Sequence, residues 1–176
     1  MNNTTFPRVL AVIASLVAIV AFFLPFISAT PEYAKYMDTR ASEKIYDSTD
    51  ITVGDMKDMS LFEYAKVYAQ AGQEIYHDPS AGIFYAVLIG AIGVAAVLTL
   101  LFALGKKPVL MMIFSIVMCG VFYLVNWDFI DRRIMPDSNR VWGISHSLYY
   151  PCAALLLICA IWLFIAKRTE NKRTSK

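Results

Sequence analysis

Charged side chains are scarce in this sequence, and its longest apolar stretches contain none of them. Only 17% of the residues are Asp, Glu, Lys or Arg, whereas 58% are hydrophobic. A soluble domain carries about 25% charged residues, because its surface has to face water. The composition therefore excludes an ordinary soluble domain and indicates a membrane protein.

The lack of charge inside the apolar runs also bears on function. Ion-coupled transporters and proton pumps usually carry ionisable groups at depth in the membrane, despite their cost. A pair of broken apolar segments at corresponding positions, which is the usual pointer to a transporter site, does not occur either. These absences weigh against a transporter acting alone. A pore made by several copies stays open.

Cysteine and histidine are too few and too widely spaced for the common redox and metal sites. The cysteines are Cys119, Cys152 and Cys159, without a Cys-x-x-Cys pair, so dithiol exchange is not predicted. A disulfide between Cys119 and Cys152 stays open. His77 and His146 belong to no zinc-binding motif. We therefore predict no metal, no cofactor and no enzymatic activity.

What the sequence does contain is four apolar runs long enough to cross a bilayer. A spanning helix needs about 20 mostly apolar residues to cover about 30 Å of hydrocarbon, and its backbone must satisfy its own hydrogen bonds. The runs cover residues 9–27, 83–104, 109–127 and 144–166. They predict an all-α integral membrane protein, a single domain over residues 1–176, with four transmembrane helices in an up-down bundle.

The first run also resembles a signal peptide, because Arg8 precedes it and the small residues Ser28 and Ala29 follow it. The apolar part of a signal peptide usually has roughly 7–15 residues, and this run has about 19. We expect an uncleaved anchor. Cleavage near Thr30 would leave three spans.

The short segment 105–108, Gly-Lys-Lys-Pro, predicts a tight turn between the second and third runs. Glycine favours the left-handed conformation that ends a helix, and proline suits the first turn of the next one. Short loops rich in Lys and Arg stay in the cytoplasm. This rule predicts a cytoplasmic turn 105–108, a cytoplasmic tail 167–176 and cytoplasmic termini, with extracytoplasmic loops at 28–82 and 126–143.

The remaining charges agree with this orientation. The predicted cytoplasmic segments carry eight basic residues and one acid, whereas the predicted outer loops carry eight basic residues and thirteen acids. The inner side is therefore net positive and the outer side net negative, as the positive-inside rule requires. We predict a multi-pass protein of the cell membrane, of the bacterial inner-membrane type.

The first outer loop, residues 28–82, is predicted to form a small α-rich cap. Ser60 and Glu63 have the spacing of a capping box, so a helix should begin after Ser60. Residues 51–53 are the only β-like stretch, and their brevity predicts an extended connection.

Small residues recur at helical spacing in two of the runs, where they let helices approach closely. The candidates for helix packing are Ala14, Ala18, Gly82, Ala86, Gly90 and Gly93. We expect them to bring the first two spans together. A face between copies in a homo-oligomer is the alternative.

Charged and aromatic residues gather in the two outer loops. They are Tyr64, Tyr68, Asp128, Asp131, Arg132, Arg133 and Arg140. They predict either salt bridges between the loops or a docking surface for a partner. The expected function is a non-enzymatic interaction or accessory subunit that lies in the lipid bilayer and binds a membrane-protein partner. The alternative is a transporter or channel component that works as a homo-oligomer. No nucleic-acid partner is predicted.

The order of elements, with a long first outer loop, a tight inner turn, a short second outer loop and a basic tail, is similar to that of claudin-like tetraspan proteins. Residues 28–82 contain neither tryptophan nor cysteine, so the first-loop signature of that family is missing. The resemblance is therefore limited to the layout and implies no role for any residue.

Overall fold

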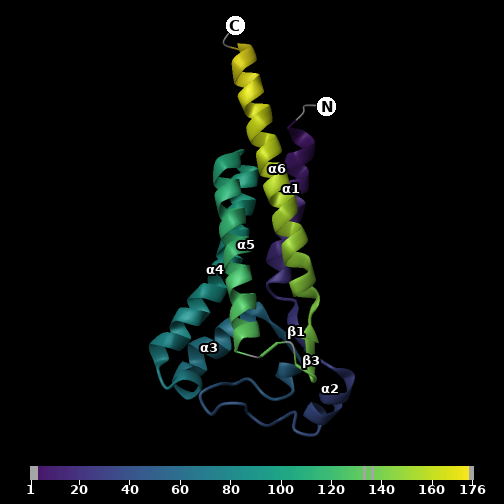
Figure 1. Cartoon of the computed structure of the whole chain (residues 1–176), viewed down its shortest axis with the longest axis vertical. Coiled ribbons are helices and arrows are strands. Elements are labelled where there is room, and N and C mark those ends of the chain that lie inside the picture. Colours follow the sequence, from purple (N-terminus) through teal and green to yellow (C-terminus); the bar gives the residue numbers. More distant parts are fainter. Residues whose placement is uncertain (1–3, 133, 136, 175–176) are drawn as a thin grey trace.

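The computed structural model describes residues 4–132, 134–135 and 137–174, and it is mostly helical (Figure 1). In chain order the elements are α1 (Thr5–Ala21), β1 (Pro25–Ala29), α2 (Pro31–Asp38), the 3₁₀ turn η1 (Asp55–Lys57), β2 (Asp58–Ser60), α3 (Leu61–Tyr76), α4 (Pro79–Leu104), α5 (Pro108–Asp131), β3 (Arg140–Trp142) and α6 (Ile144–Thr174). The three strands form one antiparallel sheet in the order β2-β1-β3.

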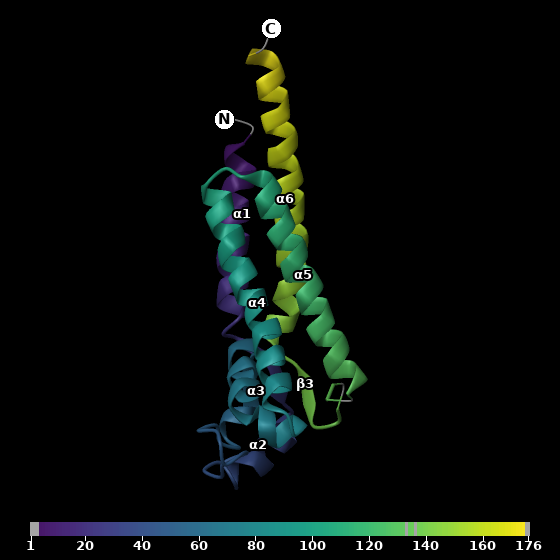
Figure 2. The ribbon, with the colours of Figure 1, turned by 90° about the vertical axis from the view of Figure 1, so that its left-hand side faces the viewer.

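Helices α1, α4, α5 and α6 pack side by side around one core. α1 contacts α4 and α6, and α5 contacts the same two helices, so the four close into a ring. Figures 1 and 2 show the α4–α5 turn at the same end of this bundle as the two chain termini. We call this the basic end. The opposite end carries α2, α3, the sheet and the loop 39–57, which together we call the head.

Three of these helices, α4, α5 and α6, are long and apolar enough to cross a membrane. Only 33% of the most apolar stretch of each helix is buried inside the protein. α1 is apolar too, but it has 17 residues and is shorter. Large apolar side chains left outside the core are typical of a helix that faces lipid. The fold is therefore that of a membrane protein.

In α1 the small side chains are buried and the large apolar side chains are exposed. Its buried side chains are small, namely Pro7, Ala11, Ala14, Ser15, Ala18 and Ala21. Its exposed large side chains are Phe6, Val9, Ile13, Leu16 and Val20. A soluble amphipathic helix places its large apolar side chains inward. The small face therefore serves close packing with α4 and α6.

The all-α expectation is wrong for the head, and the first apolar run does not stay helical to residue 27. α1 ends at Ala21, residues 22–24 form a turn, and β1 begins at Pro25. Leu24 precedes Pro25, and a residue before a proline avoids helical backbone angles, so the helix cannot continue through this position. β1 then pairs with β2 and β3, which lie far away in the chain. The β-like stretch at 51–53 contributes only an isolated bridge, Lys44 to Thr52.

The other helices begin or end several residues from the predicted limits, although each predicted helix is present. α4 starts at Pro79, α5 continues to Asp131, and α6 continues to Thr174. The capping box is confirmed. Ser60 Oγ accepts from the Glu63 amide at 3.2 Å, and Glu63 Oε2 accepts from the Ser60 amide at 2.8 Å.

The predicted turn between α4 and α5 is confirmed, but the left-handed residue is Lys106 (φ 54°) and not Gly105 (φ −76°). The Lys107 amide donates to Phe102 O at 2.9 Å and the Lys106 amide to Ala103 O at 3.4 Å. These are the two bonds of a Schellman motif. The motif therefore ends α4 one residue later than the glycine suggests.

Candidate functional site

The head is attached to the bundle where α3 packs along α4. The closest approach is between Gly72 and Gly82. A Cβ added to Gly82 would lie 2.4 Å from Gly72 Cα and 2.4 Å from Tyr68 O. No side chain fits at that distance, so only glycine permits this contact.

A second attachment is an arginine held by three elements. Arg132, directly after α5, has its Nε donating to Asp128 Oδ1 at 2.9 Å. Its guanidinium also donates to the Tyr76 hydroxyl, and it lies over the rings of Tyr85 and Tyr76 at 4.2 and 5.1 Å. The two rings are themselves stacked at 5.2 Å. Because Tyr76 belongs to α3 and Tyr85 to α4, this cluster joins α3, α4 and α5.

The electrostatics of the cluster agree with a structural role. Burial would lower the pKa of the Arg132 guanidinium, but the hydrogen bonds to Tyr76 and Asp128 outweigh it and raise the pKa. Burial is also the main cause that raises the pKa of the Tyr68 hydroxyl. The Arg132 and Asp128 side chains are only 23% and 18% exposed. Arg132 is therefore a permanent cation committed to internal contacts.

The structure distributes the predicted partner residues over several places. Tyr64 is buried, with its ring edge-on to Phe129 at 5.0 Å. Arg140 lies in β3, and Asp131 is exposed at the last position of α5. Arg133 lies outside the described residues. Four of the seven residues, Tyr64, Tyr68, Asp128 and Arg132, thus form the internal junction between head and bundle rather than one exposed surface.

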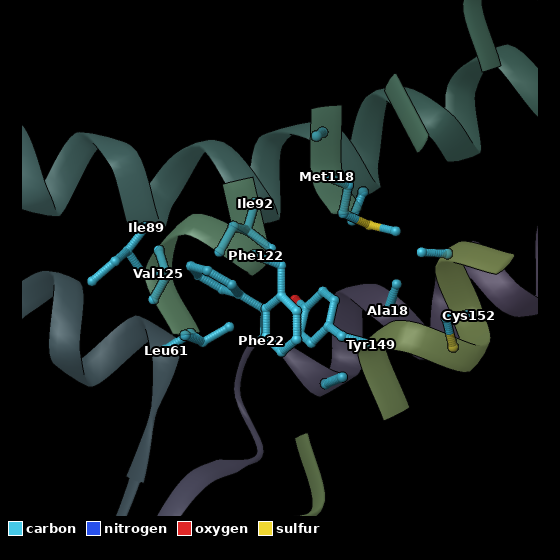
Figure 3. Packing of buried hydrophobic residues seen from close by; sticks show 14 of the residues in the cluster. Ala18, Phe22, Leu61, Ile89, Ile92, Met118, Phe122, Val125, Tyr149 and Cys152 are labelled. Atoms are coloured by element: carbon cyan, nitrogen blue, oxygen red, sulfur yellow. The ribbon is translucent and has the colours of Figure 1, made fainter. Parts of the chain in front are cut away.

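The predicted helix-packing residues also serve different contacts. Ala14 and Ala18 are buried in the bundle, and a Cβ on Gly93 would lie 3.3 Å from the ring of Phe22. Figure 3 shows Ala18 and Phe22 within this core. Ala86 is partly buried. Gly82 contacts α3 instead of α1, and a Cβ on Gly90 would meet nothing within 4 Å.

One central residue of the junction between head and bundle, Phe26, was not identified from the sequence. It lies in β1 at 0% exposure, and its ring is edge-on to those of Phe122, Phe129 and Trp142. The Gly143 amide donates to Phe26 O at 2.8 Å. The one available signal was Pro25, which marks the end of a helix. Phe26 therefore belongs to the head junction and not to a spanning helix.

Three buried hydroxyls of the bundle bond within their own helices, whereas the buried hydroxyls of Ser145 and Tyr149 in α6 have no hydrogen-bond partner among the described residues. Ser15 donates to Ala11 O at 2.9 Å, and Thr99 and Ser115 donate to the carbonyls four residues before them at 2.8 Å. The hydroxyl protons of Ser15, Thr99 and Ser115 are therefore bonded within one helix and are not free to donate to a ligand. In the residues that the structure describes, no three His, Cys, Asp or Glu side chains gather around a possible metal position, and the three cysteines are free.

The head carries a cavity of about 380 Å³, which we call the head groove. Its lining residues are Phe23, Asp50, Ile51, Asp55, Met59, Ser60, Phe62, Glu63 and Lys66. The rings of Phe23 and Phe62 lie 5.3 Å apart and are 58% and 48% exposed. Hydrogen bonds from the Thr52 amide and hydroxyl lower the pKa of Asp55. The groove therefore combines exposed aromatic faces with carboxylates.

No protein-family model matches this chain, and neither the curated proteins nor the solved structures include a significant match to it.

Tyr64 yields a test by pH. Burial raises its pKa to about 12, and its hydroxyl has no hydrogen-bond partner in the described part of the chain. A raised pKa means that the folded state keeps its proton longer than the unfolded state, so stability should fall from pH 10 to 12 by up to about 1.4 kcal/mol per pH unit for this group. We expect Tyr64→Phe to remove this part of the alkaline loss without lowering stability at pH 7. Thermal unfolding between pH 7 and 11, with the exposed Tyr36→Phe as control, measures it, and equal alkaline loss in both variants would contradict it.

Proposed function

We propose that this chain is a four-span membrane protein with cytoplasmic termini, which acts as a non-enzymatic interaction or accessory subunit through its extracytoplasmic head. The fourth span is α1. Its 17 helical residues cover roughly 25 Å at about 1.5 Å each, and the apolar turn at 22–24 lengthens it. It lies along α6 and α4 (Figure 1). A modest mismatch with the bilayer costs little.

Two features support the proposed orientation. The basic end carries Arg8, Lys106, Lys107 and Lys167, whereas thirteen of the fourteen acids lie between residues 32 and 137. Exposed Trp162 near the basic end and exposed Trp127 near the head suit the two interfaces of a bilayer. The positive-inside rule then gives a cytoplasmic basic end.

The observation that carries the interaction proposal is the head groove on a firmly attached head. The predicted contact residues Tyr64, Tyr68 and Arg132 make contacts within the protein and are not available to a partner. We therefore propose the head groove as the contact surface in their place. Aromatic faces next to carboxylates suit an Arg or Lys side chain, which gains cation–π and ionic contacts together. We therefore propose a partner that inserts a basic side chain of its own extracytoplasmic segment.

Orientation is tested by labelling with a reagent that cannot cross the membrane, in a background where Cys119, Cys152 and Cys159 are replaced by alanine. A cysteine introduced at position 35 in the head should react in sealed cells. One introduced at position 106 should react only after permeabilisation. The reverse pattern would contradict both the orientation and the function proposed from it.

The partner is tested by co-purification of the full-length protein in mild detergent. Phe62→Ser combined with Asp50→Lys should lose a stoichiometric partner, because it removes an aromatic face and reverses a charge in the groove. Tyr36→Ser combined with Glu32→Lys makes the same changes elsewhere on the head and should retain it. Equal retention in both double variants would rule out the groove as the contact surface.

The alternative, a transporter or channel component acting as a homo-oligomer, makes a different prediction. Gly90 and Gly120 face open space within one chain, so small faces there are free to meet another copy. If the alternative holds, Gly90→Leu should dissociate the oligomer in detergent and abolish ion flux in liposomes. In the accessory-subunit proposal, Gly90→Leu leaves the chain folded and its heterologous partner bound.

A further inference from the structure

A cavity of about 660 Å³ lies at the opposite end of the protein from the head. Its basic lining residues are Arg8, Lys106, Lys107 and Lys167, and its deeper apolar residues are Val12, Phe102, Ala103, Met111 and Leu163. Val9 and Ile13, on the exposed face of α1, also line it. The cavity therefore opens on the apolar outer face of the bundle.

The basic side chains of this cavity differ in whether they have a partner in the protein. Arg8 donates from Nε and Nη2 to Ala103 O and Leu104 O at 3.3 and 2.6 Å, so it caps the carboxyl end of α4. The three lysines have no carboxylate partner among the side chains that the structure describes. The described residues that line the cavity include no acid. Three positive charges thus surround one hollow, and none of them pairs with a carboxylate among the described side chains.

The local backbone adds to the positive potential. α5 begins at Pro108, and the amino end of a helix carries a partial positive charge. Lys107 is its N-cap residue, and Lys106 holds the left-handed position that glycine would occupy with less strain. The turn therefore places two lysines directly before a helix amino end.

A second hollow adjoins the first. It has a volume of about 480 Å³ and shares Lys107, Pro108 and Lys167 with the first cavity, while Val109, Leu110, Phe164 and Arg168 complete it. An anionic group held by Lys107 and Lys167 would thus have an apolar hollow on either side. A free phosphate ion has no apolar surface to bury against these residues, whereas acyl chains gain free energy by burying apolar surface there.

We propose that this basic cavity binds an anionic phospholipid, with the headgroup phosphate between Lys106, Lys107 and Lys167 and the acyl chains along the apolar walls of the two hollows. Basic pockets between spanning helices on the cytoplasmic side recognise such headgroups. The site requires only that the basic end lies at a membrane interface. It does not depend on the head groove or on any partner bound there.

The test is a titration of the detergent-purified full-length protein with dioleoyl phosphatidylglycerol and, separately, dioleoyl phosphatidylcholine, followed by native mass spectrometry. The wild type should bind the anionic lipid more tightly. Replacing Lys106, Lys107 and Lys167 by glutamine should weaken this binding by up to about 100-fold, since each basic residue contributes about fivefold. The control replaces the exposed head residues Lys35, Arg40 and Lys44 by glutamine, which makes the same change in net charge outside the head groove, and should bind as the wild type does.

Two further arms identify the source of the phosphate. Inorganic phosphate should not displace the lipid, and Val12→Trp, which fills the apolar part of the cavity, should weaken lipid binding. Equal affinity for the two lipids, equal effects of the two triple variants, or full displacement by inorganic phosphate would each overturn the proposal. None of these results depends on whether the head binds a partner, so the two proposals can fail separately.

Discussion

Gly82→Ala is expected to destabilise the protein by about 2–3 kcal/mol, which corresponds to a fall in melting temperature of roughly 5–10 °C. The new methyl group would lie 2.4 Å from Gly72 Cα and from Tyr68 O. Both obstacles are backbone atoms of α3, so no side-chain rotation relieves the clash. α3 would have to move away from α4, and the head junction would loosen. Thermal unfolding in detergent and protease sensitivity of the head measure the effect.

Gly90→Ala is the matched control for this prediction. It changes the same residue type in the same helix, eight positions further on, where a Cβ meets nothing within 4 Å. Alanine is the better helix former by up to about 1 kcal/mol, so this variant should be neutral or slightly more stable. Equal destabilisation by the two substitutions would show that the effect comes from α4 itself and not from its contact with α3.

Arg132→Gln should cost about 2 kcal/mol. The change removes the ion pair with Asp128 and the guanidinium that lies over Tyr85 at 4.2 Å and over Tyr76 at 5.1 Å. It also leaves the largely buried Asp128 carboxylate without its cation. Both partners are about one-fifth exposed, so water screens part of the interaction, and the loss should be smaller than for a fully buried pair.

Two controls accompany this measurement. Arg40→Gln breaks an exposed ion pair with Glu43 and should leave the unfolding transition unchanged. The double variant Arg132→Gln with Asp128→Asn should cost less than the sum of its single variants, because removing both partners leaves no unpaired charge. Additive losses in this cycle would contradict a direct pairing of the two side chains.

The long apolar runs predicted α4, α5 and α6, because a continuous uncharged stretch of that length has few alternatives to a helix. The local signals for the capping box at Ser60 and the turn at Lys106 were likewise read correctly, since each depends on residues within one turn of a helix. The left-handed residue of that turn was misassigned. A Schellman motif can place its left-handed residue at Lys106 instead of Gly105 at a small cost in strain. The local composition does not show which of the two positions is used.

The sheet and the head groove could not be predicted, because their partners are distant in the sequence. Phe26 belongs to an apolar run by composition, and only the pairing of β1 with residues 58–60 and 140–142 takes it out of the helix. The burial of Tyr64, Tyr68 and Arg132 in internal contacts could not be predicted either. A polar residue next to a spanning segment suits a solvent-exposed surface as well as a buried junction, and α3 lying along α4 decides between them.

The helices, their apolar character and the separation of basic from acidic segments could be predicted without a structure, because these properties follow from residues close together in the chain. The contacts between small residues, the burial of charged groups in internal contacts and the positions of the cavities became known only from the fold. Those outcomes depend on which distant surfaces meet, and the free energy of such contacts is not encoded in any single stretch of the chain.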